Sequence, residues 1–416
     1  MKDILVLGAG SAGTMMVNHL KKKLNKNEWR LTIVDQEKTH YYQPGFLFMP
    51  FDIYTEDQIK KPTEKFIPKG VQYINEVIDR IDADNNNVLL ENGQELGYDI
   101  LIIATGTTPN PDEIEGMSDE GWYKDIFDFY TIEGARALTE KLKDWEGGKL
   151  VMHICEMPIK CPVAPLEFAF LADWYFTKKG MRDKVEITYV TPMSDAFTKP
   201  VAAKKLDYLL KEKQIKIVGD FNIEHVDAEN KKIVDYAEEE VPYDLLVTVP
   251  TNMGSPMIER SGLGDELNFV ATDHHTLQSK EHENVFVIGD ATDLPTSKAG
   301  SVAHFQAEIL TENILHYING EELDPAFDGH ANCFVETGFG KGLLIDFNYE
   351  QEPVEGTFPI PGVGPMQLLK ESWLNHIGKL AFKWIYWNML MKGRAIPFIP
   401  TQMSTAGKKI EEPVMA

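Results

Sequence analysis

The chain has 416 residues, 43% of them hydrophobic, which is enough to build a large core in two or three domains. Its 65 acidic and 41 basic residues give a formal net charge of −24, which argues against nucleic acid as a partner because phosphates require a basic surface. The three cysteines are too few for a disulfide framework, and none has the spacing of a zinc site, so we predict no metal site.

The start of the chain bears on where the protein resides. It opens on an apolar strand, DILVLGAG, with no charged segment or cleavage site ahead of it. No uncharged apolar run is long enough to span a bilayer. We therefore expect a protein without a signal peptide that stays on the cytoplasmic side of the cell membrane.

Residues 1–35 have the pattern of a dinucleotide-binding βαβ unit. The strand ILVLG leads into GAGSAG, a helix follows, and a second strand, RLTIVD, ends in an acidic residue. The glycines permit a tight turn, the close approach of a pyrophosphate and helix–strand packing, while the acid binds ribose hydroxyls. The candidate residues are Gly8, Gly10, Gly13 and Asp35.

Two later segments indicate which dinucleotide binds. Residues 98–110, YDILIIATGTTPN, and residues 284–295, NVFVIGDATDLP, have the pattern of buried strands that end in small-residue turns. Both are similar to signature segments of flavoproteins with two dinucleotide-binding domains, and the resemblance implies FAD as the cofactor. The residues it assigns to FAD are Thr105, Gly106, Gly289, Asp290 and Lys298.

A second βαβ unit starts at KLVMHIC and returns at VEITYVTP, residues 185–192. In related enzymes the turn of this unit carries the glycines that bind NAD(P), whereas residues 155–162 of this chain read CEMPIKCP. Prolines remove backbone donors, and side chains larger than glycine block a pyrophosphate. We therefore expect this unit to have the fold without an NAD(P) site.

The cysteines indicate redox chemistry. Cys155 ends a strand, and we interpret it as a buried core residue. Cys161 lies in a turn at the start of the helix APLEFAFLADWYF, where the helix dipole lowers a thiol pKa and favours the thiolate. Cys333 lies in a glycine-flanked, strand-like segment, GHANCFVETGFGKG. Two such cysteines next to a flavin suit thiol–disulfide chemistry.

The motifs, taken in order, resemble those of sulfide:quinone oxidoreductase and of the flavoprotein subunit of flavocytochrome c. They are GAGSAG, ATG, CPVAPLEF, IGDA, KAGSVAHFQAE and a late cysteine before ETGFGKG. The resemblance covers nearly the whole chain, and its cysteine motif is more specific than its glycine motifs.

The resemblance implies a mechanism. Cys161 and Cys333 would form a redox pair beside FAD, and sulfide or polysulfide would attack the bridge between them. Cys161 would carry the sulfur, Cys333 would face the flavin, and the electrons would pass to a membrane quinone. Glu167 matches a family glutamate and is the implied proton acceptor. The alternative for this residue is a glutamate on the helix surface.

The chain departs from the common form of that family. It has no third cysteine near residue 125 and no histidine in TPMSDAFTKP. It also lacks the cysteine in THYYQPGFLF that would attach FAD covalently, so we expect noncovalent FAD. Aromatic residues late in the chain are the expected wall of a quinone channel, with a lysine that polarises a quinone oxygen. These candidates are Phe339, Lys341, Phe347, Tyr349 and Phe382.

Residues 368–393 place apolar and aromatic residues at helical spacing among several lysines. The segment is too charged to span a bilayer, and its tryptophans favour a helix that lies in the membrane interface. The alternative is packing on the protein itself or on a partner subunit. We also expect FAD to bind without this segment. The apolar positions are Leu369, Trp373, Ile377, Leu380, Trp384, Trp387 and Leu390.

The predicted fold class is α/β, with two Rossmann-like domains and a C-terminal membrane-associating region. We expect the FAD domain in residues 1–113 and 256–320, the second Rossmann-like domain in residues 114–255, and a C-terminal region with a redox cysteine and amphipathic helices in residues 321–416. Two other functions remain open: a type II NADH:quinone dehydrogenase, and a non-catalytic flavin-bearing sulfur carrier. The sequence also leaves open a homo-oligomer.

Overall fold

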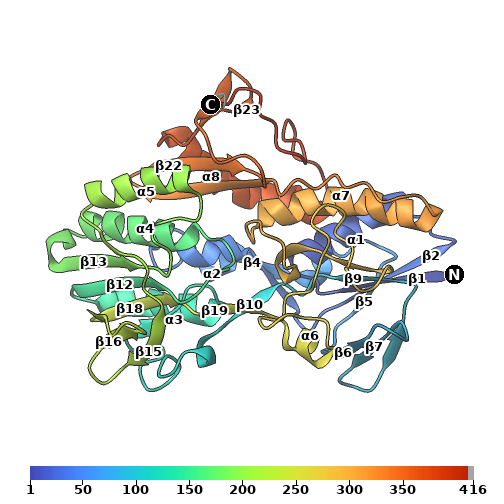
Figure 1. Cartoon of the computed structure of the whole chain (residues 1–416), viewed down its shortest axis with the longest axis horizontal. Coiled ribbons are helices and arrows are strands. Elements are labelled where there is room, and N and C mark those ends of the chain that lie inside the picture. Colours follow the sequence, from blue (N-terminus) through green and yellow to red (C-terminus); the bar gives the residue numbers. More distant parts are fainter. Residues whose placement is uncertain (411–416) are drawn as a thin grey trace.

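The computed structural model describes residues 1–410 and contains two five-stranded parallel sheets (Figure 1). The first sheet has the order β20-β9-β1-β2-β5, with β1 (Lys2–Leu7) in the centre. Its other strands are β2 (Trp29–Val34), β5 (Gln72–Ile74), β9 (Ile100–Ile103) and β20 (Val285–Val287). The chain therefore leaves this sheet after β9 and returns to it at β20.

The second sheet has the order β11-β18-β12-β13-β14 and is built from the intervening residues. Its strands are β11 (Ile126–Phe127), β12 (Gly148–Ile154), β13 (Val185–Val190), β14 (Lys216–Val218) and β18 (Leu245–Val249). Strands such as ILII in β9 and LLVTV in β18 are buried along their whole length. Continuous apolar runs of this kind are typical of parallel sheets that are covered on both faces.

Helices pack around both sheets. The α1 helix (Ser11–Lys23) and α7 (Gly300–Asn319) lie together against the first sheet (Figure 1). Those near the second sheet are α3 (Ile132–Asp144), α4 (Ala164–Lys178) and α5 (Pro200–Glu212). Two short helices are α2 (Glu56–Ile59) and α6 (Pro256–Arg260).

The two crossings between the sheets pair with each other. The antiparallel ribbon of β10 (Thr107–Asn110) and β19 (Thr251–Gly254) carries the chain out of the first sheet and back to it. Small antiparallel sheets complete the two halves. They are β3 (Thr39–Tyr41) with β4 (Lys60–Pro62), β6 (Ile78–Asp82) with β7 (Asn87–Leu90) and β8 (Glu95–Gly97), and β15 (Ile223–Asp227) with β16 (Lys232–Asp235) and β17 (Glu240–Pro242).

The C-terminal region lies across both halves at the top of Figure 1. The hairpin of β21 (Ala331–Gly338) and β22 (Lys341–Phe347) contacts α4 and α7 through β21. The later elements are β23 (Gly356–Ile360), β24 (Gly364–Leu368), α8 (Trp373–Asn388) and the 3-10 turn η6 (Leu390–Lys392). Since α8 packs on this hairpin and η6 packs on α1, the region is part of the core of the molecule.

The structure divides the apolar positions of the last segment between the interior and the surface. Trp387 and Leu390 are buried, and Trp387 stacks on Phe66 at 5.2 Å. Trp373 and Trp384, by contrast, are each 63% exposed. The helix buries one side against the protein and leaves an apolar strip, defined by Trp373, Ile377 and Trp384, on the outside.

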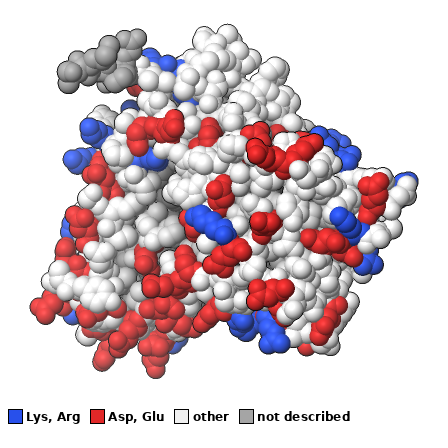
Figure 2. All heavy atoms as spheres, turned by 45° about the vertical axis from the view of Figure 1, so that its right-hand side comes forward, with Lys and Arg blue, Asp and Glu red and all other residues white. Residues whose placement is uncertain are grey.

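The described residues include no helix that is both long and apolar enough to cross a membrane. Acidic side chains are spread widely over the face that Figure 2 shows, in keeping with the net charge of −24.

The turn between β1 and α1 depends on two glycines. Gly8 has a φ of +97°, which side chains other than glycine adopt only with strain. A Cβ on Gly13 would lie 1.9 Å from the carbonyl oxygen of Gly8, so α1 contacts β1 at a distance that only glycine permits. A Cβ on Gly10 would meet no atom within 4 Å. Gly13 therefore serves the packing of the fold, whereas the space beside Gly10 is open.

We expect Gly13→Ala to lower the free energy of unfolding by about 1–3 kcal/mol, because the new methyl group forces α1 away from β1. Gly10→Ala is the matched control and should leave the thermal midpoint of the ligand-free protein nearly unchanged. Thermal unfolding of both variants measures this difference. Equal midpoints would contradict the assignment of Gly13 to close packing.

Candidate active site

A cleft of about 820 Å³ opens at the carboxyl ends of the first sheet's strands and reaches the turn after β12. The chain connects β1 to β2 on one side and pairs β9 with β1 on the other, which makes this edge the topological switch point of the first sheet. Ligands of open α/β sheets bind at such a point. The cleft is therefore the candidate active site.

The structure brings nearly all the predicted cofactor residues to this cleft. Gly13 is the exception, because it faces the backbone of β1 instead. The residues that line the cleft are Gly8, Gly10, Asp35, Thr105, Gly106, Gly289, Asp290 and Lys298.

The helix termini at the cleft fit an anionic dinucleotide. Both α1 and α7 begin at its wall, and the N-cap residues Gly10 and Ala299 make no side-chain capping hydrogen bond. Their first-turn N–H groups are thus without side-chain partners, and such groups bind phosphates. Together with the open space beside Gly10, these termini suit a flavin dinucleotide.

Two charged residues at the cleft, Asp35 and Lys298, form hydrogen bonds with backbone groups of its wall. The Asp35 carboxylate accepts a hydrogen bond of 2.5 Å from the N–H of Ala9, and burial raises its pKa. The Lys298 ammonium donates to the carbonyls of Asp290 at 2.9 Å and Thr292 at 2.7 Å. Burial lowers the pKa of Lys298 to about 8. Lys298 therefore holds the loop after β20 in place.

The turn after β12 uses its backbone donors within the protein. The N–H of Cys155 donates to Val249, that of Lys160 to the side chain of Asn252, and that of Cys161 to Lys298. A nucleotide pyrophosphate in this turn would find these three donors already occupied. The hydrogen bonds instead join the turn to the end of β18, to β19 and to the loop before α7.

Cys161 lines the cleft, but the expectation of a lowered thiol pKa is wrong. Burial raises the pKa of Cys161 to about 11, and the nearby Lys379 opposes that rise. The helix α4 begins only at Ala164, three residues further on, and it has no side-chain cap. Desolvation of the thiolate therefore outweighs the dipole of the helix.

The other two cysteines are buried. Cys333 lies on β21, and burial raises its pKa well above the usual range, with a further rise from Cys161 and opposition from Lys379. The resemblance gives Cys333 the flavin-facing role, whereas in the structure Cys161 is the cysteine at the cleft wall. Cys155 is buried as predicted, 3.4 Å from the Thr248 hydroxyl. All three are free thiols in the structure.

Glu167 is fully buried, so it is not the surface glutamate that the sequence left open. Its carboxylate forms an ion pair with Lys379 of α8 at 2.7 Å and accepts a hydrogen bond of 2.6 Å from the N–H of Glu336. The Lys379 ammonium also donates to the carbonyl of Phe334 at 3.0 Å. Burial raises the pKa of Glu167, and Lys379 opposes this rise. Both groups also line the cleft, next to Cys161.

A second ion pair extends this network toward the surface. The Glu336 carboxylate lies 2.7 Å from Nδ1 of His376, which is half-buried on α8. Burial raises the pKa of Glu336, and His376 opposes that rise. The two ion pairs are thus neighbours, and the backbone N–H of Glu336 joins one to the other.

Of the three residues that α8 brings to the cleft, the sequence analysis named Phe382 and missed Lys379 and Tyr386. The Tyr386 hydroxyl lies 2.7 Å from Ser11 Oγ and 2.6 Å from Nε2 of His40. Lys379, Phe382 and Tyr386 recur at intervals of three and four, which is the signal of one helix face. This face forms part of the cleft wall, and the expectation that the cofactor binds without residues after 368 stays a prediction.

The structure does not gather the proposed quinone residues. Phe382 lines the cleft. Phe339 is 48% exposed in the turn between β21 and β22, whereas Lys341 and Phe347 are at opposite ends of β22. Six residues of strand separate that pair by about 20 Å. The hydroxyl of Tyr349 donates to the carbonyl of His274 at 3.2 Å.

Comparisons with known proteins place this site in context. The family model of the pyridine nucleotide-disulphide oxidoreductases matches residues 2–307. The mitochondrial sulfide:quinone oxidoreductase of Mus musculus is 28% identical over 400 residues, which cover 94% of this chain and 86% of that protein. A type II NADH:quinone oxidoreductase of Staphylococcus aureus is 24% identical over 374 residues, covering 83% of this chain and 90% of that protein.

Solved structures share the fold. The sulfide:quinone oxidoreductase from Aquifex aeolicus has a TM-score of 0.78 at 20% identity, and the match covers 95% of this chain and 92% of that one. The NAD-dependent persulfide reductase from A. fulgidus has a TM-score of 0.62 at 21% identity and covers 84% of this chain and 65% of that one. The predicted α/β class with parallel Rossmann-like cores is therefore confirmed.

We expect Lys379→Met to lower the free energy of unfolding by about 3–5 kcal/mol, because it leaves Glu167 buried without a partner. Adding Glu167→Gln to that variant should restore part of the loss, since the two residues act on each other. Lys383→Met is the control on the same helix, where only a contact with the Tyr54 ring is lost. Denaturant unfolding gives the three values, and strict additivity of the two changes would contradict the ion pair.

Proposed function

Since the chain belongs to the pyridine nucleotide-disulphide oxidoreductase family and is an oxidoreductase with a flavin cofactor, we propose that it oxidises sulfide and passes the electrons to a membrane quinone. The single observation that carries this proposal is the position of Cys161. It occupies the turn where a nicotinamide-binding relative would hold a pyrophosphate, and it lines the cleft beside the buried pair of Glu167 and Lys379. The proposed cofactor is noncovalent FAD, which supplies a two-electron acceptor when bound.

The proposed reaction begins at a bridge between Cys161 and Cys333. Hydrosulfide attacks the sulfur of Cys161, a new S–S bond forms there, and the bridge breaks so that Cys333 leaves as a thiolate. Cys161 suits the attacked position because it is half-buried at the cleft wall, whereas Cys333 lies deeper. A second hydrosulfide then takes the outer sulfur from Cys161 and leaves with it as a disulfane, which returns Cys161 to a thiolate. The two thiols can then close the bridge again, and FAD, when bound, would supply the acceptor for the two electrons that this releases.

Lys379 and Glu167 have separate tasks in this proposal. Burial disfavours both thiolates, and the Lys379 ammonium lowers the pKa of each thiol against that burial. It therefore stabilises the thiolate that leaves. The Glu167 carboxylate, which lines the cleft, is the proton acceptor.

The membrane would be reached through the apolar strip of α8. Trp373, Ile377 and Trp384 are exposed on one side of this helix, and tryptophan favours the bilayer interface. The same helix presents Phe382 and Tyr386 to the cleft. A quinone held at that surface would thus be one helix diameter from the cleft, about 10 Å. Such docking places the protein on the membrane without spanning it.

A type II NADH:quinone dehydrogenase is the second candidate, because such an enzyme from Staphylococcus aureus is among the relatives. The backbone N–H groups of the turn after β12 argue against this candidate, because they already donate within the protein and are not free for a nucleotide phosphate. The third candidate is a non-catalytic sulfur carrier, which would use the same cleft to hold a persulfide but would not turn over.

Anaerobic mixing separates these candidates. We expect sulfide to bleach the flavin absorbance of the purified protein and a quinone to restore it, while millimolar NADH or NADPH leaves it unchanged. Cys161→Ser and Cys333→Ser should each lose sulfide-dependent quinone reduction by orders of magnitude, and the double variant should be little worse, since the pair acts as a unit. Cys155→Ser is the control with near-normal turnover. Rapid bleaching by NADH would support the dehydrogenase, and full turnover by Cys161→Ser would refute the cysteine pair.

Vesicle binding tests the apolar strip. We expect Trp373→Ser and Trp384→Ser to weaken sedimentation with anionic vesicles while the flavin stays bound, because each change removes exposed aromatic area from α8. Tyr236→Ser is the matched control, since Tyr236 is 74% exposed and follows β16, a strand at the lower left of Figure 1, whereas α8 is near the top. If all three variants sediment like the wild type, another surface docks the protein.

A further inference from the structure

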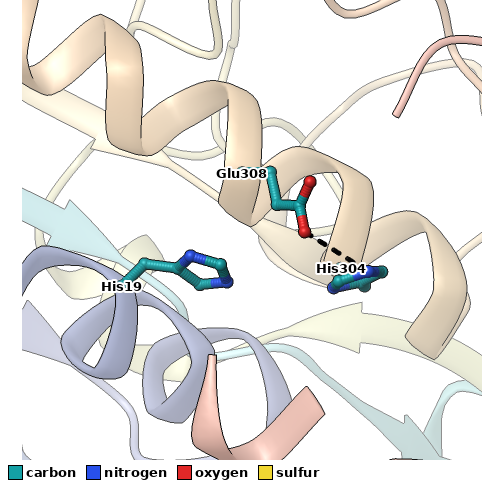
Figure 3. A group of neighbouring side chains, drawn as sticks. All are labelled: His19, His304 and Glu308. Atoms are coloured by element: carbon teal, nitrogen blue, oxygen red, sulfur yellow. Dashed lines mark ion pairs between the residues drawn. The ribbon is translucent and has the colours of Figure 1, made fainter. Parts of the chain in front are cut away.

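Three side chains outside the cleft converge between α1 and α7. His19 comes from α1, and His304 and Glu308 come from successive turns of α7 (Figure 3). One nitrogen or oxygen atom of each lies within 4.8 Å of the other two. The ring of His19 points across the gap toward the other two side chains, and His304 Nε2 lies 3.6 Å from Glu308 Oε1 (Figure 3).

The polar atoms of this group lack hydrogen bonds. His304 is 1% exposed, yet its Nδ1 has no partner. His19 Nε2 and Glu308 Oε1 are likewise buried without a partner. Leaving such groups unpaired costs about 1–3 kcal/mol each, so unpaired atoms on three neighbouring side chains indicate a missing ligand.

The neighbouring charges do not fill the gap. The Lys22 ammonium donates to the carbonyls of Lys392 and Gly393 at the end of η6. The Lys23 ammonium forms an ion pair with Glu312 at 3.0 Å. Burial lowers the pKa of both His19 and His304 to about 4, so each ring has a free lone pair near neutral pH.

We propose that His19, His304 and Glu308 bind a divalent transition-metal ion, with Zn²⁺ as the best fit. Two imidazoles and one carboxylate are a common zinc ligand set, and a water completes the tetrahedron. Zinc bonds of about 2.0–2.2 Å place ligand atoms roughly 3.3 Å apart. The present separations, which are at most 4.8 Å, would shorten to that value when an ion binds. This site is independent of the proposed sulfide chemistry, since none of its residues lines the cleft.

The ion would join three parts of the fold. The helices α1 and α7 both begin at the cleft wall, and the metal would hold them together one to two turns further along. The end of η6 contacts α1 beside this site, because Gly393 packs against the backbone of Asn18 and His19. The ion would therefore link α1 to α7, next to the position where Gly393 contacts α1.

Metal titration of the flavin-loaded full chain tests this site. Chelator-treated protein is titrated with Zn²⁺ by calorimetry and with Co²⁺ by visible absorption, which reports a four-coordinate site. We expect one ion per chain and a rise of the thermal midpoint with Zn²⁺. Loss of an outer-sphere partner already costs about 10- to 100-fold in metal affinity, so Glu308→Gln and His304→Gln should lose at least that much.

The controls separate this site from surface binding. His316→Gln changes another histidine of α7, whose nearest carboxylate is Glu321 at 3.9 Å, and it should bind Zn²⁺ like the wild type. Glu308→Gln keeps the shape of the side chain, so its flavin spectrum and metal-free midpoint serve as the folding check. No binding by the wild type, or equal affinity in Glu308→Gln and the wild type, would overturn the proposal.

Discussion

The buried ion pair of Glu167 and Lys379 is the constraint on which the rest of the site depends. Removing two charges from water costs several kcal/mol per ion, and the pair repays this only when further hydrogen bonds satisfy both groups. Here the N–H of Glu336 and the carbonyl of Phe334 supply those bonds. Both belong to β21, so α4, β21 and α8 are stable in this arrangement only when all three are assembled.

This assembly also fixes which side of α8 faces the cleft and which side faces outward. The side of α8 that carries Lys379 also delivers Tyr386 to Ser11 and His40, at the start of the first βαβ unit. The opposite side keeps Trp373 and Trp384 exposed. One amphipathic helix therefore closes the cleft and offers an apolar strip to the outside. Lys379 lies on the side of the helix that faces the cleft, and the two exposed tryptophans lie on the other side.

The two sheets show how one fold supports different chemistry. After β1, glycines leave open space and unpaired helix N–H groups that suit a dinucleotide. After β12, the N–H groups of the equivalent turn donate to Lys298, to β18 and to β19, and the turn places Cys161 at the cleft. Burial raises the pKa of both thiols, and Lys379 is the local charge that favours a thiolate.

The sequence by itself determined the fold class, the glycine turn and the set of residues that line the cleft from the first sheet, such as Asp35 and Asp290. These depend on local backbone geometry and on the rule that parallel strands bring their carboxyl ends to one edge, so short motifs suffice. The pKa of Cys161 was predicted in the wrong direction, because it depends on burial by distant segments. The partner of Glu167 lies 212 residues away, and His19 meets His304 only through helix packing. Only the tertiary structure decided these contacts, since no local pattern encodes which distant side chain shares a buried charge.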